Sequence, residues 1–176
     1  STLLPRMGER PLLTPDPFSG LSIGLSNCRP TSRGEITLKS ADPFTHPKIR
    51  ANAYSTDRDV EEMLAAVKYL RHIAKQEPIC SLIAEELRPG PEVQCDDDLI
   101  ADFRARSGTV YHPSCTVRMG NDPETTAVDP DLKVRGVEGL RVCDASVFPT
   151  LVGGNTNAPS ILTGWIGADR ILQRAH

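Results

Sequence analysis

The sequence predicts an α+β protein in which helices pack on an antiparallel sheet. Two kinds of periodicity indicate this class. Short stretches of alternating apolar and polar residues in the first third of the chain are typical of half-buried strands. Longer stretches with apolar residues three and four positions apart are typical of helices that bury one face. With 176 residues, the chain is long enough for one sizeable core or for parts of two domains.

The predicted sheet comes first along the chain. Residues 1–20 are rich in Pro and Gly and predict an extended lead-in. Apolar residues alternate with small or polar ones over 21–25 and again over 36–38, and residues 29–34 between them have the composition of a turn. The simplest interpretation is an antiparallel hairpin of these two strands. Residues 48–54 are expected to add a third strand after two proline breaks.

Three helices are expected. Residues 57–76 place their apolar side chains close to one face, and acidic residues crowd the first turn, where the helix dipole favours negative charge. Pro78 ends this helix. A second helix is predicted from residue 96 or 97 to 106, with Gly108 as its terminator. A final helix is predicted over about 158–173.

The pattern changes after Gly108. Short β-like stretches then alternate with Gly, Pro and Asn, at 109–111, 132–134 and 140–143. We therefore expect a domain boundary near residue 107, which divides the chain into residues 1–107 and 108–176.

The composition excludes several classes of function. The net charge of −3 does not favour a nucleic-acid partner or an anionic membrane surface, and the apolar stretches are too short for a membrane-spanning segment. The four histidines are too dispersed to predict a zinc site. The five cysteines, without a CxxC pair, favour reduced thiols in a cytoplasmic protein. No GxGxxG or GxxxxGK[ST] loop is present for a dinucleotide or nucleotide phosphate.

His112 is the first residue whose surroundings point to chemistry. It follows a short β-like stretch and precedes Pro113, which biases the preceding residue toward an extended backbone. An imidazole with a pKa of about 6.5 suits proton transfer near neutral pH. The alternative is a histidine that caps a loop by hydrogen bonds. Cys115, three residues later, is more simply a buried thiol than a nucleophile, because no orienting group is identifiable.

A second segment of interest leads into the final helix. Gly153 and Gly154 permit a close approach to the main chain, and the Asn155 side chain offers both a donor and an acceptor. Asn157 is a credible N-cap, with Pro159 tolerated in the first turn. A helix N-terminus after glycines favours negative charge by about 0.3–2 kcal/mol. The alternative is an ordinary turn into a core helix, whose apolar run is Ile161, Leu162, Trp165, Ile166 and Ile171.

An ordered set of motifs carries a resemblance to a known family. The segments Tyr111-His112-Pro113-Ser114-Cys115-Thr116, Gly139–Ser146 with its Asp144-Ala145 pair, and Pro149–Pro159 resemble the C-terminal signature of the glucose–methanol–choline (GMC) oxidoreductases. Arg29–Gly34, Ser40–Pro43, Asn52–Tyr54 and Asp59 are similar to parts of the family's substrate domain. The resemblance covers all but the lead-in.

This resemblance implies the C-terminal part of an FAD-dependent, choline dehydrogenase-like alcohol oxidoreductase. Residues 1–107 would belong to the antiparallel substrate-binding domain, and residues 108–176 would be a C-terminal segment of the FAD-binding α/β domain that also contributes to the active site. His112 would accept the alcohol proton as hydride passes to flavin N5, and Asn155 would be the second catalytic residue. The implied cofactor contacts are Asp144, Ala145, Thr156, Asn157, Ala158 and Pro159, and no metal is implied.

The chain departs from the family pattern in lacking the glycine loop for the ADP part of FAD. We therefore expect the full-length protein to bind FAD and a small-molecule alcohol, with the missing N-terminal FAD-binding half as a partner. This chain alone is expected to bind FAD weakly or not at all, and to be inactive. Two alternatives on the same fold stay open, namely a non-catalytic binding or structural module and a flavin-containing hydroxynitrile lyase.

Overall fold

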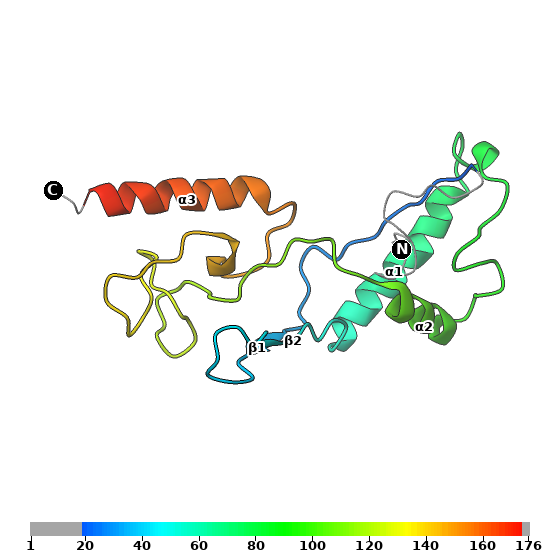
Figure 1. Ribbon diagram of the computed structural model, residues 1–176. Coiled ribbons are helices and arrows are strands. Elements are labelled where there is room, and N and C mark those ends of the chain that lie inside the picture. The colour runs from blue at the N-terminus through cyan, green and yellow to red at the C-terminus, as the bar shows by residue number, and fades with distance from the viewer. Residues whose placement is uncertain (1–18, 174–176) are drawn as a thin grey trace. The chain divides into compact units, whose positions relative to one another are not determined.

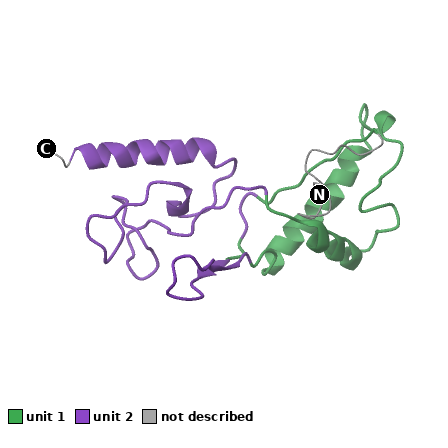
Figure 2. Cartoon of the chain, in the orientation of Figure 1, with its two compact units in different colours: residues 1–27, 31–33, 52–109 green, residues 28–30, 34–51, 110–176 purple. Residues whose placement is uncertain are grey.

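The computed structural model describes residues 19–173, so residues 1–18 of the predicted lead-in lie outside the described part. The chain divides into two compact units (Figure 2). Unit 1 is built from residues up to Asn27, Thr31–Arg33 and Asn52–Thr109, and unit 2 from Cys28–Pro30, Gly34–Ala51 and the residues from Val110 on. The described residues contain three α-helices and a two-stranded antiparallel sheet, which confirms the α+β class.

Unit 1 contains the first two helices, α1 (Asp57–Ala74) and α2 (Asp96–Arg106), and a short 3-10 turn, η1 (Cys80–Leu82) (Figure 1). Both helix predictions are confirmed, although α1 ends two residues before its predicted end. Local capping explains where the helices begin. Thr56 has an extended backbone and its hydroxyl accepts the Asp59 N–H, and the Cys95 side chain accepts the Asp98 N–H.

The core of unit 1 lies between these two helices. Met63 and Val67 from α1 pack with Leu99 and Phe103 from α2, and the last two are 2% and 1% exposed. The ring of Tyr54 lies 5.1 Å from that of Phe103, centroid to centroid. These few apolar side chains hold α1 and α2 together.

The sheet lies in unit 2 and differs from the predicted hairpin. Strand β1 (Glu35–Thr37) pairs antiparallel with β2 (Lys48–Arg50), with Ile36 opposite Ile49. The prediction that 21–25 pairs with 36–38 is therefore wrong, because residues 21–25 form no strand and the segment predicted as a third strand is the partner. The alternation at 21–25 has another cause: Leu25 packs against the α1–α2 core.

Gly34 is required where the chain enters β1. A Cβ at this position would lie 2.4 Å from the Arg50 carbonyl oxygen and 2.7 Å from that of Ala51. The absence of a side chain lets the two strands approach.

The remainder of unit 2 is mostly irregular chain around a second core of Val128, Leu132, Val147 and Phe148. The stretches predicted as strands at 132–134 and 140–143 pair only through isolated bridges, Val128 with Val134 and Lys133 with Arg141, and 109–111 forms no strand. The 3-10 turn η2 (Ala145–Val147) precedes helix α3 (Asn157–Leu172), which runs alongside it in Figure 1.

Helix α3 confirms the third predicted helix, but its predicted N-cap is wrong, and the alternative of an ordinary core helix does not fit the exposure of its side chains. Its N-cap is Thr156, and Asn157 is already the first helical residue. The large side chains of the predicted core run are exposed, with Ile161 at 61%, Leu162 at 60% and Trp165 at 71%. The buried contact is made through small residues, because a Cβ at Gly167 would lie 2.4 Å from the Cys143 Sγ.

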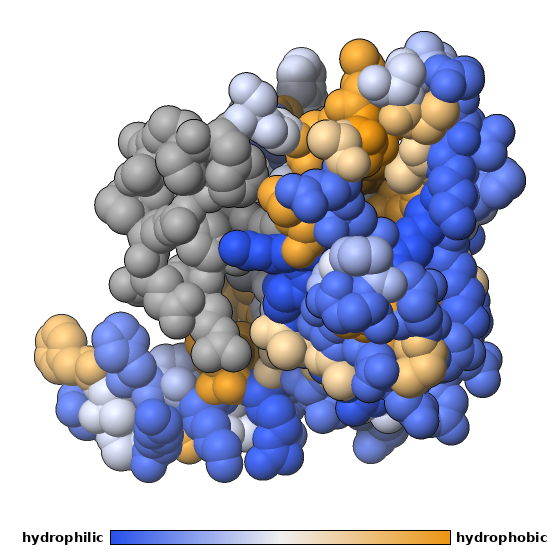
Figure 3. Space-filling view, turned by 90° about the vertical axis from the view of Figure 1, so that its right-hand side faces the viewer, coloured by the Kyte–Doolittle hydropathy of each residue, from blue (hydrophilic) through white to orange (hydrophobic). Residues whose placement is uncertain are grey.

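The surface of the described chain carries other large apolar side chains as well, including Leu38, Phe44 and Leu82. The face drawn in Figure 3 is nevertheless largely hydrophilic, with scattered hydrophobic patches. Within residues 19–173, every helix is too short or too polar to span a membrane.

Candidate active site

The loop that carries His112 is held in an unusual backbone conformation. Tyr111 and Cys115, on either side of it, have φ angles of 61° and 68°. Residues other than glycine adopt this left-handed region at a cost of about 1–3 kcal/mol each, and they keep it only where the surrounding structure enforces it. Strained residues of this kind cluster at functional sites.

Backbone hydrogen bonds tie this loop to the Asp144-Ala145 segment. The N–H groups of Cys115 and Val117 donate to the carbonyls of Ala145 and Ser146 at 3.2 and 2.9 Å, and Met119 N–H donates to Val147 at 2.9 Å. Two of the three signature segments predicted from the sequence therefore run side by side.

The third segment reaches the imidazole. His112 Nδ1 lies 3.1 Å from Thr156 Oγ1, across 44 residues of sequence, and both side chains are half-buried. Thr156 directly follows Asn155, whose side chain is exposed. The fold thus brings the loop of Asn155 to His112, and the hydroxyl in contact with the imidazole belongs to Thr156.

Asp144 shapes the turn into η2. Its carboxylate accepts the Ser146 hydroxyl at 2.5 Å and the Ser146 N–H at 2.8 Å. These bonds, with the hydroxyl contributing most, hold the pKa of Asp144 below its usual value, so the side chain is a carboxylate at neutral pH. The carbonyl of Ala145 is also engaged, because it accepts Cys115 N–H and Phe148 N–H.

Two of the three segments, with Ser160 from α3, line a hollow of about 380 Å³ beside these residues, and His112, Asn155 and Thr156 are not among its lining residues. Its lining residues are Pro113, Ser114, Thr116, Asp144, Ala145, Ser146, Ser160 and, from β1, Ile36. Ser114 and Ser160 were not among the residues predicted for the site. Ser160 could have been found from helix geometry, because it lies four residues after Thr156 and so shares its face of α3.

The first turn of α3 is not capped by a side chain. Thr156 has a helical backbone, with φ −80° and ψ −8°, and its hydroxyl makes no cap hydrogen bond. The first N–H groups of a helix lack partners within the helix and favour negative charge. Asn157 and Ala158 are exposed here, and Pro159 has no N–H to satisfy.

Gly153 and Gly154 lie in open surroundings. Neither has a positive φ, and a Cβ at either position would meet no atom within 4 Å. Nothing within the described chain therefore requires glycine at these positions, and the main chain before α3 is open to a group from outside.

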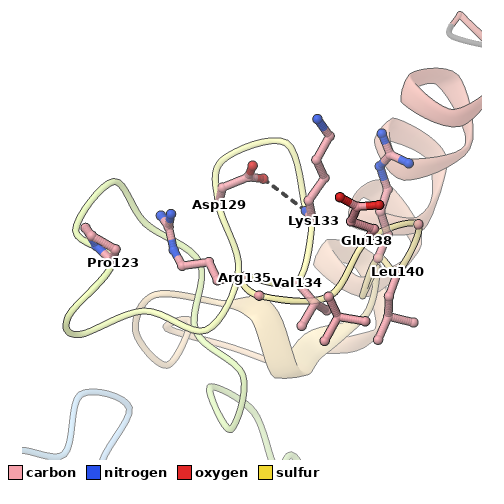
Figure 4. A pocket seen from close by; sticks show the side chains of 11 residues that line it. Pro123, Asp129, Lys133, Val134, Arg135, Glu138 and Leu140 are labelled. Carbon is pink, nitrogen blue, oxygen red and sulfur yellow. Dashed lines mark hydrogen bonds between the residues drawn. The ribbon is translucent and has the colours of Figure 1, made fainter.

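A larger hollow of about 810 Å³ lies elsewhere in unit 2 (Figure 4). Residues 133–141, with Pro123 and Asp129, line it, and Asp129 accepts the Lys133 backbone N–H at 3.0 Å. None of the predicted site residues lines it. In residues 19–173, no group of three or more His, Cys, Asp or Glu side chains is placed to hold a metal ion.

Comparisons with known proteins bear on this site. The profile of the GMC oxidoreductase family matches residues 30–164. The chain is 43% identical over 155 residues to an alcohol dehydrogenase [acceptor] of Pseudomonas putida, and 45% identical over 144 residues to the mitochondrial choline dehydrogenase of Homo sapiens. These matches cover 88% and 81% of this chain but 28% and 24% of the relatives, so the chain spans about a quarter of their length.

Solved structures resemble the described chain over most of its length. A fungal aryl-alcohol oxidase superposes with a TM-score of 0.76 at 36% identity, covering 84% of this chain and 24% of that one. The formate oxidase of Aspergillus oryzae RIB40, in a study of its FAD modification, superposes with a TM-score of 0.75 at 32% identity, covering 80% of this chain and 25% of that one.

Proposed function

Because the chain belongs to the GMC oxidoreductase family, we propose that it forms the C-terminal part of an FAD-dependent enzyme that oxidises the CH–OH group of an alcohol. The observation that carries this proposal is the hydrogen bond between His112 and Thr156, which joins the histidine loop to the loop of Asn155. The names of the relatives support the substrate class, since they include alcohol, choline and aryl-alcohol oxidoreductases.

His112 acts as the general base. Hydride leaves the carbinol carbon readily only as the hydroxyl loses its proton, and a neutral imidazole accepts that proton. A positioned base of this kind contributes about 10²–10⁴-fold to the rate. His112 is half-buried, its ring contacts Thr156 Oγ1 at 3.1 Å, and Tyr111 and Cys115 in the same loop have left-handed backbones, an arrangement that suits a role that depends on orientation.

Asn155 orients the substrate. Its carboxamide is exposed at the end of the Gly153-Gly154 segment, so its N–H is free to donate to the substrate oxygen while His112 takes the proton. The contribution is positional, because the hydrogen bond holds the reacting carbon in line for transfer.

The residues that lead into α3 fit a flavin nucleotide. The first turn of α3 offers uncapped N–H groups, and the open main chain at Gly153 and Gly154 leaves room for a planar ring system. The proposed contacts are Asp144, Ala145, Thr156, Asn157, Ala158 and Pro159. Asp144 would act through the turn it shapes, because its carboxylate is already engaged by Ser146. When bound, FAD supplies the two-electron acceptor for the oxidation.

The division of labour between the two parts of the chain is also a proposal. Residues 1–107 contribute to the substrate-binding domain, and residues 108–176 contribute to the FAD-binding domain and the active site. The hairpin of β1 and β2 belongs to the same compact unit as the histidine loop, and Ile36 lines the hollow. Substrate contacts from this hairpin are therefore included in the proposed site.

The missing N-terminal FAD-binding half is the partner we propose for α3. Gly167 is buried against Cys143 on one side of this helix, while Ile161, Leu162 and Trp165 are exposed on another. A helix that is apolar on more than one side is normally buried within a larger protein. The matches cover only 28% and 24% of the two relatives' length, so the remaining polypeptide would cover this face, and this chain alone would be inactive.

An assay of the full-length protein tests the proposed function. We expect an artificial electron acceptor to be reduced with at least one alcohol from a panel of choline-like, aliphatic and aromatic alcohols. His112→Ala should lower kcat by about 10²–10⁴-fold. His72→Ala is the matched control, because His72 is exposed on α1. Unchanged turnover in His112→Ala would remove the histidine from the reaction, and absence of reduction with every alcohol would reject the redox function.

A further inference from the structure

We propose that Thr156 is a positioning residue that selects the tautomer of His112. Its hydroxyl oxygen accepts the Nδ1–H of the imidazole, which leaves Nε2 as the atom that accepts a proton. The basis is the 3.1 Å contact between Nδ1 and Oγ1. The inference rests on the proposed role of His112 as the general base, and it assigns Thr156 a function distinct from contact with a cofactor.

The conformation of Thr156 supports this role. A threonine at the start of a helix normally has an extended backbone and caps an N–H of the first turn. Thr56 does this at the start of α1, with φ −112° and ψ 144° and its side chain accepting Asp59 N–H. Thr156 occupies the equivalent position before α3, but its backbone is helical and its hydroxyl caps nothing in the helix. The side chain is used for His112 instead.

Both partners of this hydrogen bond sit on segments that are fixed independently. The carbonyl of Thr156 accepts the Ser160 N–H at 3.0 Å and the Ser160 hydroxyl at 2.6 Å, which fastens the first turn of α3. The histidine loop is fastened by Cys115 N–H on Ala145 and by the conformation of Tyr111. A hydrogen bond between two such segments restricts the rotation of the ring.

The direction of the hydrogen bond follows from the proton that must move. A neutral imidazole carries one N–H donor and one acceptor nitrogen. If Nδ1–H donates to Thr156, the lone pair is on Nε2, and Nε2 can take the proton from a substrate hydroxyl. After the transfer, both ring nitrogens are donors, and Nδ1–H still donates a hydrogen bond to the threonine Oγ1. The opposite tautomer would carry its proton on Nε2 and could not accept one there.

Nuclear magnetic resonance of the ¹⁵N-labelled 176-residue chain tests the inference without FAD or alcohol. Correlations between ring nitrogens and carbon-bound ring protons report which nitrogen carries the proton, and His112→Asn identifies the signals. We expect the Nδ1–H form to dominate in the neutral ring of the wild type. In Thr156→Val, which lacks only the hydroxyl, the ratio of tautomers should fall by about fivefold, whereas Thr156→Ser should retain it.

Three outcomes would overturn the inference: a dominant Nε2–H form in the wild type, an unchanged ratio in Thr156→Val, or equal loss in the valine and serine variants. Backbone amide spectra of each variant show whether α3 is intact. In the full-length enzyme, Thr156→Val should lower kcat with little change in KM, and Thr156→Ser should restore it. A full-length enzyme that oxidises alcohols and needs His112, combined with an Nε2–H ring, would reject this inference while the proposed function stands.

Discussion

The carboxylate of Asp59 accepts the backbone N–H of Thr31 at 2.7 Å, although the two residues lie 28 positions apart. The same oxygen takes the Thr31 hydroxyl at 2.8 Å, and the other oxygen takes the Ser32 N–H at 2.8 Å. Asp59 is only 2% exposed. This buried side chain in the first turn of α1 therefore fastens the segment that leads toward the hairpin.

Replacing Asp59 by Asn should destabilise the chain by about 1–3 kcal/mol. The amide NH₂ group would replace one carboxylate oxygen, so the backbone N–H of either Thr31 or Ser32 would lose its acceptor. Asp57→Asn is the matched control: it removes a charge from the same turn but from an exposed position, where the dipole contribution is about 0.3–1 kcal/mol. Urea unfolding monitored by circular dichroism measures both. Equal losses in the two variants would mean that the contribution of Asp59 is only that of charge near a helix end.

The same site predicts a dependence of stability on pH. Burial by itself would raise the pKa of Asp59, but the hydrogen bonds from Ser32 and Thr31 outweigh burial and hold it well below its usual value. A carboxyl whose pKa is depressed by folding adds stability above its unfolded pKa of about 3.9, and the stability is lost as the pH falls below it. The difference in unfolding free energy between wild type and Asp59→Asn should therefore shrink below about pH 4. A constant difference from pH 7 to pH 3 would contradict this assignment.

Gly167 should not tolerate a methyl group. Its Cβ would lie 2.4 Å from Cys143 Sγ and 2.9 Å from Cys143 Cβ, so Gly167→Ala should cost about 1–3 kcal/mol. Gly164→Ala is the control on the same helix, because its nearest contact is the Cys143 carbonyl oxygen at 3.7 Å, an ordinary distance. The control should gain up to about 1 kcal/mol from helix propensity. Thermal unfolding of both variants shows whether each substitution raises or lowers the stability. Adding Cys143→Ala should recover part of the stability that Gly167→Ala loses.

The exposed face of α3 predicts a difference between this chain and the full-length protein. Trp165 is 71% exposed, so Trp165→Glu should change the stability of the 176-residue chain by no more than about 0.5 kcal/mol. In the full-length protein, the same change would bury a charge in the proposed contact with the N-terminal half and should lower the flavin content. Urea unfolding of the chain and the flavin absorbance of the full-length protein measure the two effects. Full flavin content in the variant would show that this face stays in solvent.

The three helices and the family signature could be predicted from the order of residues alone. The start of α1 follows from Thr56 and the acidic residues after it. The limits of α2 follow from residues within the helix and from its cap. Both could be predicted because capping and periodicity are local properties of the chain. The motifs around His112, Asp144 and Asn155 could also be recognised in the sequence, since each is a short run of adjacent residues.

The contacts between these segments, by contrast, depend on how the chain folds in three dimensions. Alternation at 21–25 indicated a half-buried segment but not what covers it, and Leu25 turned out to face helices while β1 paired with β2. The apolar run of α3 did not show that Gly167 would be buried and Trp165 exposed. Nor did any local pattern link Thr156 to His112, because a hydrogen bond across 44 residues depends on two separately folded loops meeting in space.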